Sequence, residues 1–573
     1  METSASTSAF SPSPYQSMSV FRRTFRFAEV VGDPSPYINE DIKPLPPSRR
    51  TWTKTTFFWF WLATTINVSD LAGSSTLLSL GLNVWQSILA TVIADLIITA
   101  ALVANGMQGG TWHIPFAVGN RAPWGVRGAW FVVANRLILS FVWYGYQGWF
   151  GGQLVKNLIA TFWPGFYTMK NHFPASANMK TNDFICYVIF WCLAFPLLFV
   201  RPERYRIPAV VSSFCVSIAT IALLAYVVAK QGNAGPLIYD TSKLLKIKPL
   251  TSVQLGWAMT RGITAKIGAW SGAIIYAADF SRYARKPGDQ IWGQAFIVPA
   301  SLIGTSVIGL IITSCGAGLY PESGLLWQPY KMIQAIQQHN PTSGCRAALF
   351  FLSLSFICSQ LCINVVTCGV VGGIDLATMF PRYIDVKRGS AVVAVVGFAI
   401  NPWQLVNTAT TFLSVLSGYS IFLGPLAGIM FADYFVLRRQ KVRLSHLYTP
   451  NYSSDYWFFH GVNLKAPFVW ACSIGPSLPG FISTVTKGKV VVSLKLVRLS
   501  YLAWPLGFAI ATFLWLVLNK IDRPPGVGQV DDADVFGTFD ELTDSVGSNS
   551  ELAVPTFGNE TSKKLADEEE PKL

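Results

Sequence analysis

Long apolar stretches separated by short polar loops are the dominant pattern of this 573-residue chain. The apolar stretches cover residues 57–78, 87–106, 128–151, 184–200, 208–229, 256–280, 293–318, 347–374, 390–406, 409–432, 466–486 and 498–518. A helix of about 20 apolar residues spans the hydrocarbon core of a bilayer. The pattern therefore predicts an all-α polytopic membrane protein with twelve transmembrane helices.

Composition supports a membrane protein and argues against several other classes. Hydrophobic residues make up 51% of the chain and charged residues 13%, roughly half the charged fraction of an average soluble protein. The net charge of +14 is interpreted as loop charge that orients the spans, so no nucleic-acid partner is expected. Nine Cys and five His, without a CxxC pair, predict no metal site, no cofactor and no disulfide framework.

The distribution of basic residues predicts the topology. An even number of spans places both termini on one side of the membrane. Arginine is concentrated in alternate loops, at 119–128, 201–206, 281–290, 381–390 and 437–465. Because basic residues are retained on the cytoplasmic side, both termini are expected in the cytoplasm.

Polar tails flank the spans and divide the chain into three regions. These are an N-terminal tail and arm at 1–56, the transporter core at 57–518 and a C-terminal tail at 519–573. The polar start before the first span predicts that there is no cleaved signal peptide. From Ile521 onward the tail carries 13 acidic and 4 basic residues, which is typical of a solvated, disordered segment. Such a tail either keeps the end soluble or docks trafficking or ubiquitylation machinery.

Two spans carry features that are typical of broken helices. The first has a belt of small and polar residues from Asn67 to Thr76, halfway along its length. The sixth contains Gly262, Gly268 and Gly272, with Trp270 beside them. Unwound backbone is tolerated at membrane depth only where it lines a protein cavity. Both spans are therefore expected to unwind at a shared binding site.

Asp70 is the one carboxylate of the first span. A charged group at this depth is costly and usually functional. It is a candidate to bind a cation, to take up a proton or to pair with a cationic substrate. The alternative is an ion pair with a neighbouring helix, for which Arg136 is the candidate partner, without a role in transport.

The third span places Trp143 and Gln147 four residues apart, on one face of a helix. An indole and a nearby amide suit a flat heterocycle, which stacks on the ring and hydrogen-bonds to the amide. The alternative is a tryptophan that marks the membrane interface.

The eighth and tenth spans carry further candidates. Thr367 and Cys368 lie among small residues, which either face a site or let helices approach closely. Phe412, Leu416 and Tyr419 recur on one face of the tenth span, either as packing or as a movable apolar gate.

Seven short segments, taken together and in order, carry a resemblance to a known family. They are WLA with SLGLNVWQ, NRLILSFVWYGYQ, AADFSRYARKP, GGIDLATMFPRYIDVKRG, NPWQLV, FLGPLAGIMFADYFVLRR and IGPSLPGFI. The chain resembles the nucleobase–cation symporter-1 family, in its fungal branch of uracil, allantoin and uridine permeases. The match runs from the N-terminal arm to the last span.

The resemblance implies a LeuT-like fold of two inverted five-helix repeats followed by two C-terminal helices. It implies that Trp143 and Trp270 sandwich the substrate ring and that Gln147 binds its polar edge. Phe412, Leu416 and Tyr419 then form the outer gate. Further roles implied by the resemblance are a coupling pair of Asp375 with Lys286 and an inner-gate residue, Asp41.

Two departures from the family pattern concern the substrate. The Ser-Ala-Asn element of uracil and allantoin members reads Val366-Thr367-Cys368 here, so Thr367 or Cys368 has to replace the asparagine. In the first span the usual Thr-Trp pair reads Asp70-Leu71, and an anionic group favours a cationic ligand. Cys368-Gly369 is similar to the thiamine-type branch.

The functional prediction is a plasma-membrane importer of a small heterocyclic nutrient by proton symport with alternating access. A proton on Asp375, or second on Asp70, would neutralise the loaded site while it reorients. An importer of a cationic vitamin or nucleoside is the alternative within transport, and a membrane nutrient sensor is the alternative outside it. An enzyme is not expected, because the sequence lacks a nucleophile–base pair, a metal spacing or a phosphate loop.

Overall fold

The computed structural model describes residues 37–241, 249–486, 489–537 and 539, and all of its regular elements are helices. The α-helices are α2 (Lys54–Thr65), α3 (Val68–Ser75), α4 (Val84–Trp112), α5 (Phe116–Gly119), α6 (Arg121–Trp124), α7 (Ala129–Phe162), α8 (Thr181–Ala194), α9 (Arg206–Gln231), α11 (Ser252–Ser281), α12 (Asp289–Trp292), α13 (Val298–Leu319), α14 (Pro329–His339), α15 (Ser343–Ile363), α16 (Val371–Met379), α17 (Val386–Ala399), α18 (Ala409–Phe431), α19 (Leu444–Leu447), α20 (Lys465–Ile474), α21 (Leu478–Val485), α22 (Leu494–Ser500) and α23 (Ala503–Ile521). The π-helical segments are η8 (Gly293–Ile297), η10 (Asn364–Val370) and η12 (Ala432–Leu437). The 3₁₀ segments are η1 (Pro47–Arg49), η2 (Thr76–Leu80), η3 (Pro164–Thr168), η4 (Ala175–Ala177), η5 (Phe195–Phe199), η6 (Pro202–Tyr205), η7 (Pro236–Ile238), η9 (Pro321–Ser323), η11 (Pro402–Gln404) and η13 (Gly475–Ser477).

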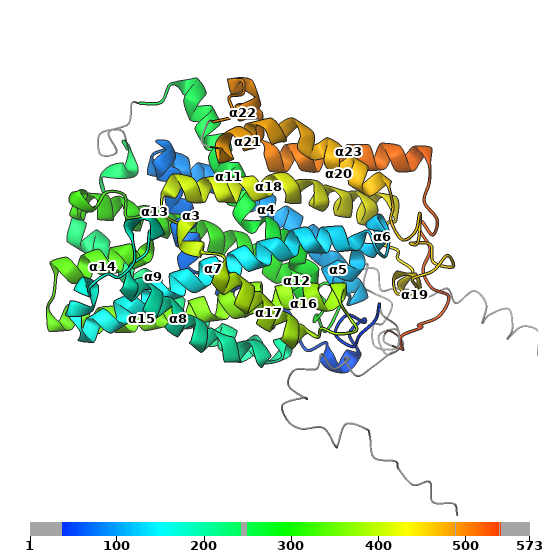
Figure 1. The fold of residues 1–573 in the computed structure, drawn as a ribbon, viewed down its shortest axis with the longest axis horizontal. Helices are drawn as coiled ribbons and strands as arrows, with labels where there is room; N and C mark the ends of the chain where they lie inside the picture. The colour runs from blue at the N-terminus through cyan, green and yellow to red at the C-terminus, as the bar shows by residue number, and fades with distance from the viewer. Residues whose placement is uncertain (1–36, 242–248, 487–488, 538, 540–573) are drawn as a thin grey trace, which may run out of the picture.

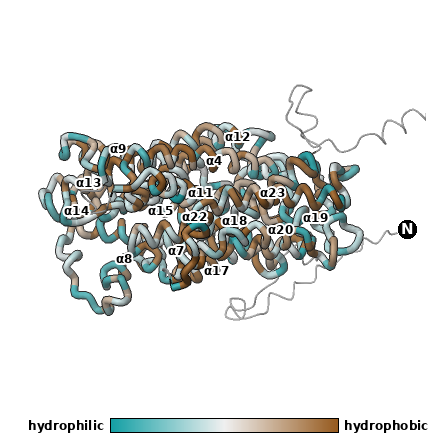
Figure 2. Tube along the Cα trace, turned by 90° about the horizontal axis from the view of Figure 1, so that it is seen from above, coloured by the Kyte–Doolittle hydropathy of each residue, from teal (hydrophilic) through white to brown (hydrophobic). Residues whose placement is uncertain are grey.

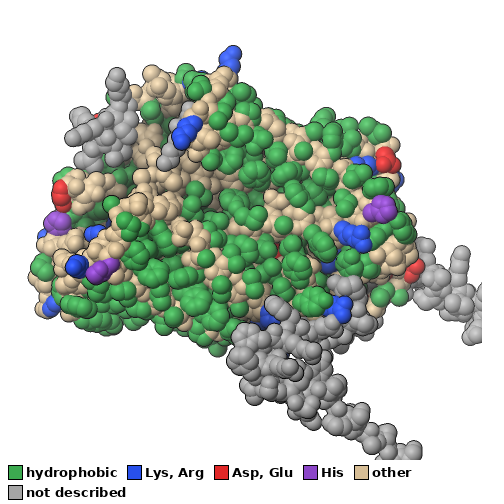
Figure 3. Space-filling view, in the orientation of Figure 1, with side chains coloured by type: hydrophobic (Ala, Val, Ile, Leu, Met, Phe, Trp, Pro, Cys, Tyr) green, Lys and Arg blue, Asp and Glu red, His purple; other side chains and the backbone are tan. Residues whose placement is uncertain are grey.

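The long helices form one bundle and run along its longest dimension (Figure 1). Hydrophobic positions dominate the middle of the bundle, whereas hydrophilic positions become frequent towards its two ends (Figure 2). On the face shown in Figure 3, hydrophobic side chains cover the middle and most charged side chains lie towards the ends. An apolar belt between two charged ends is the surface that a bilayer requires.

Eight of the twelve predicted spans coincide with helices that are long and apolar enough to cross a membrane. The other four coincide with the α2–α3 pair and with α7, α11 and α17. Of these, α2–α3 is interrupted, α17 has 14 residues, and α7 and α11 carry polar side chains towards the interior. The helix α17 ends before Asn401, whose φ of +56° is left-handed, and Pro402 follows it. The all-helical membrane class is thus confirmed, and the count of twelve stays a prediction.

The predicted break in the first span is present between α2 and α3. The helix α2 ends at Thr65, and Asn67 is the N-cap of α3, where its side chain accepts a hydrogen bond from the backbone NH of Asp70 at 2.8 Å. An N-cap asparagine satisfies an NH that would otherwise lack a partner at the start of a helix. The cap places Asp70 in the first turn of α3, facing the interior of the bundle.

The predicted break in the sixth span is wrong for this structure, because α11 is one continuous helix of 30 residues. Its glycines serve close packing instead. A Cβ on Gly268 would lie 2.1 Å from the backbone oxygen of Leu416 in α18. Helices approach closely in membranes where small residues line the contact, so Gly268 brings α11 and α18 together.

Replacing Gly268 by alanine is expected to lower the thermal unfolding midpoint of the purified protein by several degrees. The added methyl group has to displace the backbone of α18, and overpacking of this kind costs about 1 to 3 kcal/mol. Gly256→Ala is the matched control on the same helix, because nothing lies within 4 Å of its Cβ and alanine favours the helix. An unchanged midpoint for Gly268→Ala would contradict the packing role.

The eighth span is divided by a π-helical turn. The helices α15 and α16 continue through η10, which contains Thr367 and Cys368. Single π-helical turns within α-helices are frequent at functional sites. Here the wider turn occurs beside the central cavity described below.

The N-terminal arm, the α19 loop and the start of the C-terminal tail pack at the same end of the bundle (Figure 1). The backbone of Trp52 pairs with Tyr283 and Arg285 after α11. In the tail, the Asp531 carboxylate accepts a hydrogen bond from the backbone NH of Ser445 at 3.0 Å. Residues 522–537, which were expected to be solvated and disordered, therefore follow a defined path. The rest of both predicted tails, 1–36 and 540–573, lies outside the described residues.

Candidate functional site

A cavity near the centre of the bundle, with an empty volume of about 900 Å³ that includes its mouth, is the candidate binding site. Side chains from α3, α7, α11, η10 and α18 line it. The lining residues are Thr64, Asn67, Ser69, Asp70, Gly73, Leu77, Arg136, Leu139, Ser140, Trp143, Gln147, Ala265, Lys266, Ala269, Trp270, Gly272, Ala273, Tyr276, Ile363, Thr367, Cys368, Phe412, Leu413 and Leu416.

The substrate-binding candidates from the sequence all lie in the wall of this cavity. They are Asp70, Trp143, Gln147, Trp270, Thr367 and Cys368. The two indoles come from α7 and α11, more than 100 positions apart in the chain. The fold therefore brings the predicted stacking and hydrogen-bonding groups to one place.

The amide of Gln147 is held in a defined orientation. Its side-chain oxygen accepts hydrogen bonds from the Ser69 hydroxyl and from Nε2 of Gln360. Gln360 Nε2 also lies 2.9 Å from the backbone oxygen of Gln147. No acceptor for the Gln147 NH₂ group is found among the described residues, so this group is left to donate into the cavity.

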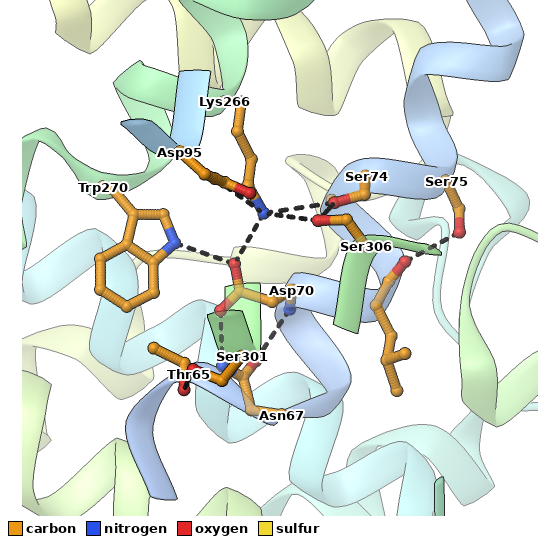
Figure 4. A network of polar contacts seen from close by, with 12 residues as sticks. Thr65, Asn67, Asp70, Ser74, Ser75, Asp95, Lys266, Trp270, Ser301 and Ser306 are labelled. Atoms are coloured by element: carbon orange, nitrogen blue, oxygen red, sulfur yellow. Dashed lines mark hydrogen bonds and ion pairs between the residues drawn. The ribbon is translucent and has the colours of Figure 1, made fainter. Parts of the chain in front are cut away.

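Asp70 is bound by three groups, one at the start of α3 and two on α11 (Figure 4). Its carboxylate accepts hydrogen bonds from Asn67 at 2.6 Å and from the Trp270 indole NH at 2.9 Å. Lys266 Nζ lies 3.3 Å from Oδ1 of Asp70. The suggested pairing of Asp70 with Arg136 is thus wrong, and the partner is Lys266, which comes from α11.

Arg136 forms a second buried charge cluster, with Asp375 of α16 and Asp279 of α11. Arg136 makes an ion pair with Asp375, and its Nη2 lies 3.6 Å from Asp279 Oδ2. All three side chains are buried. The pairing of Asp375 with Lys286 implied by the family resemblance is not seen here, because Lys286 is exposed after the end of α11. The guanidinium of Arg136 reaches both carboxylates through Nη2 from a buried position, whereas Lys286 is outside the bundle interior.

Asp41 lies in the N-terminal arm and joins two elements of the same end of the bundle. Its Oδ2 accepts a hydrogen bond from the backbone NH of Val386, the first residue of α17, at 3.2 Å. Its backbone oxygen accepts one from Arg282, just after α11, at 2.7 Å. The arm therefore connects the end of α11 to the start of α17, and the inner-gate role of Asp41 stays a prediction.

The predicted outer-gate residues lie above one wall of the cavity. Phe412 stacks with Tyr146 and Trp327, with ring centroids 5.0 and 5.6 Å apart. Phe412 and Leu416 line both the main cavity and a smaller apolar pocket next to it, and Tyr419 lines the smaller pocket. These side chains separate the two spaces.

Sequence reasoning missed Lys266 and Asp95, and it included Ser69 only as part of the polar belt of the first span. Asp95 is the one acidic or basic residue of the apolar stretch 87–106, and Lys266 lies in the stretch 256–280 between Arg261 and Asp279. Ionisable residues at this depth are a functional signal in a membrane protein. Among the described residues, no group of three or more His, Cys, Asp or Glu side chains could hold a metal ion.

The family described as permeases for cytosine/purines, uracil, thiamine and allantoin matches residues 44–507 of this chain. The transporter aclS of Aspergillus oryzae is 32% identical over 561 residues, which cover 88% of this chain and 90% of the relative. The allantoin permease of Saccharomyces cerevisiae is 32% identical over 85% of this chain and 76% of its own length. The uracil permease of the same yeast is 30% identical over 85% of this chain and 76% of its own length.

Among solved structures, the inward-facing conformation of Mhp1 matches with a TM-score of 0.64 and 20% identity, over 86% of this chain and 96% of that one. Mhp1 in a closed conformation with bound bromovinylhydantoin matches with a TM-score of 0.60 and 22% identity, over 83% of this chain and 96% of that one. This likeness shows the fold. The relatives are transporters, so the protein is a multi-pass membrane transporter and not an enzyme. With a matched region that includes both indoles, the Gln147 amide and both charge clusters, the chain belongs to the nucleobase–cation symporter-1 family of permeases.

Proposed function

We propose that this protein imports a neutral, carbonyl-bearing heterocycle, such as uracil, uridine or allantoin, by proton symport. The observation that carries the proposal is the cavity wall that combines Trp143, Trp270 and the oriented amide of Gln147. Flat rings bind well between indoles. The amide oxygen of Gln147 is already hydrogen-bonded, so only its NH₂ group is left to bind the substrate. A donor of this kind selects a ring that carries a carbonyl acceptor.

The charge of the site favours a neutral ring over a cationic vitamin or nucleoside. Asp70 was expected to favour a cation, yet Lys266 lies 3.3 Å from it and Trp270 donates to it. A cationic ligand would have to displace the lysine from Asp70, and the exchange of one buried cation for another brings little net gain.

The proposed protein has twelve spans, arranged as two inverted five-helix repeats and two further helices. It lies in the plasma membrane and alternates between an outward-open and an inward-open state. Both termini are cytoplasmic. Asp41 and Asp375 act at the inner gate, with Lys286 close to that end, and Phe412, Leu416 and Tyr419 act at the outer gate. Thr367 and Cys368, which line the same cavity as Gln147, contribute to the binding site. The buried cluster of Arg136 with two carboxylates supports proton uptake at Asp375, because one positive charge is lacking there.

Replacing Gln147 by alanine is expected to abolish measurable uptake while the protein still reaches the membrane. The substrate loses its oriented donor, and Ser69 and Gln360 lose their shared acceptor. Uptake of radiolabelled uracil and allantoin, with surface protein quantified by immunoblot, measures both parts. Asn135→Ala on the same helix is the control, since that side chain lies outside the cavity lining and donates to the backbone oxygen of Phe131.

Normal uptake by a correctly localised Gln147→Ala variant would exclude this cavity as the site. Competition of uptake by unlabelled uracil, allantoin, uridine, thiamine and nicotinamide riboside identifies the substrate class. Competition by the two cationic compounds alone would contradict the preference for a neutral ring. Ligand-dependent signalling without accumulation would favour a sensor.

A further inference from the structure

Asp95 is a completely buried carboxylate near the middle of α4, and the proposed transport mechanism does not use it. Its side chain is 0% exposed. Neither of its oxygens accepts a hydrogen bond from the described residues. Groups of this kind are normally hydrogen-bonded or neutralised, because an isolated buried carboxylate costs several kcal/mol.

The charged group nearest to Asp95 is Lys266, which other groups hold more closely. Lys266 Nζ lies 4.0 Å from Asp95 Oδ1, compared with 3.3 Å from Asp70 Oδ1. It also donates to the hydroxyls of Ser74 and Ser306, at 3.2 and 3.3 Å. Figure 4 shows the ammonium between Asp70, the two serines and Asp95.

The cluster lacks one positive charge. The elements that face Asp95 contribute Lys266 from α11, Asp70 from α3 and the neutral hydroxyl of Ser306 from α13. Two carboxylates against one ammonium leave a net charge of −1 in the middle of the bundle. One added proton would remove the charge deficit, and it would turn one of the two Asp95 oxygens, neither of which accepts a hydrogen bond from the described residues, into a hydroxyl donor.

A metal ion is not needed for this neutralisation. The oxygens of Asp70, Ser74 and Ser306 already surround one cation, the lysine ammonium. A sodium ion would need several of the same oxygens as ligands. A proton needs one oxygen, and Asp95 supplies it.

We propose that Asp95 binds a proton that moves with the substrate, an inference that rests on the proposed symport function. The proton adds to a carboxylate oxygen of Asp95 while the site faces outward and leaves it to the cytoplasm. Protonated Asp95 is neutral and no longer attracts the Lys266 ammonium, so the ammonium pairs with Asp70 alone in the cavity wall. The loaded site is then neutral when it reorients, whereas the empty, deprotonated site is not.

The test compares proton flux with substrate flux in proteoliposomes that contain the full-length protein. Proton flux is read with a pH-sensitive dye and substrate flux with radiolabelled uracil and allantoin. For Asp95→Asn we expect the proton-to-substrate ratio to fall by one whole proton, while counterflow without a pH gradient continues. An unchanged ratio would overturn the inference alone. Absence of counterflow in the wild-type protein would overturn the proposed function and the inference with it.

A control and a second variant keep the test decisive. Thr91→Val, one turn earlier on α4, removes a hydroxyl that bonds to Ile88 and should leave the ratio unchanged. If Asp95→Asn does not reach the membrane, Asp95→Glu retains an acid with a longer side chain. The pH midpoint of its uptake should then shift by about half a unit or more, and an unchanged midpoint would overturn the inference.

Discussion

Replacing Arg136 by methionine is expected to remove nearly all folded protein from the membrane. The substitution keeps the volume of the side chain but leaves Asp375 and Asp279 buried without their shared cation. Removing one partner of a buried ion pair costs about 3 to 5 kcal/mol, a large part of the stability of most domains. Surface protein, measured by immunoblot, and the monodisperse fraction after detergent extraction are the readouts.

Two further variants separate lost charge from lost packing. Arg285→Met, at an exposed position after α11, should leave the surface protein unchanged. Adding Asp279→Asn and Asp375→Asn to Arg136→Met removes the uncompensated charges and should restore folded protein without restoring uptake. Wild-type amounts of active Arg136→Met protein would show that the cluster does not stabilise the fold.

Replacing Trp270 by alanine is expected to raise the half-saturating substrate concentration about 30- to 150-fold, which corresponds to about 2 to 3 kcal/mol. One stacking surface of the cavity is lost, and Asp70 loses the indole NH that lies 2.9 Å from its oxygen. Trp270→Phe keeps an aromatic ring but not the donor, so a smaller rise of about tenfold is expected. Concentration-dependent uptake in cells or proteoliposomes measures both values.

The control for this prediction is a tryptophan outside the cavity. Trp85 is 57% exposed on α4, so Trp85→Ala should change the half-saturating concentration by less than about twofold. Equal effects of Trp85→Ala and Trp270→Ala would mean that the loss reflects general instability rather than stacking.

The positions of most helices and the composition of the site could be read from the apolar stretches and their polar interruptions. The belt of small and polar residues from Asn67 to Thr76 indicated the break in the first span, because small and polar side chains weaken a helix within their own stretch of the chain. Trp143 and Gln147 were found because a spacing of four places them on one face of a helix. Signals of this kind are local, so they do not depend on which helices pack together.

The partners of the charged groups could not be read in the same way. The sequence suggested Arg136 as the partner of Asp70, whereas the structure pairs Asp70 with Lys266. Asp375 pairs with Arg136 rather than Lys286. In the sixth span, the glycines predict a break, whereas the closeness of Gly268 to Leu416 makes it a packing position in a continuous helix.

The order of residues along the chain was sufficient to establish a helical membrane protein, the first-span break and the side chains of one cavity, because helix length, capping and periodicity act over a few residues. Packing of the bundle determined which carboxylate meets which cation, because these contacts join α3, α4, α7, α11 and α16 across more than a hundred positions. An ion pair at 3.3 Å, such as Asp70 with Lys266, depends on the crossing of two helices. No local pattern encodes that geometry.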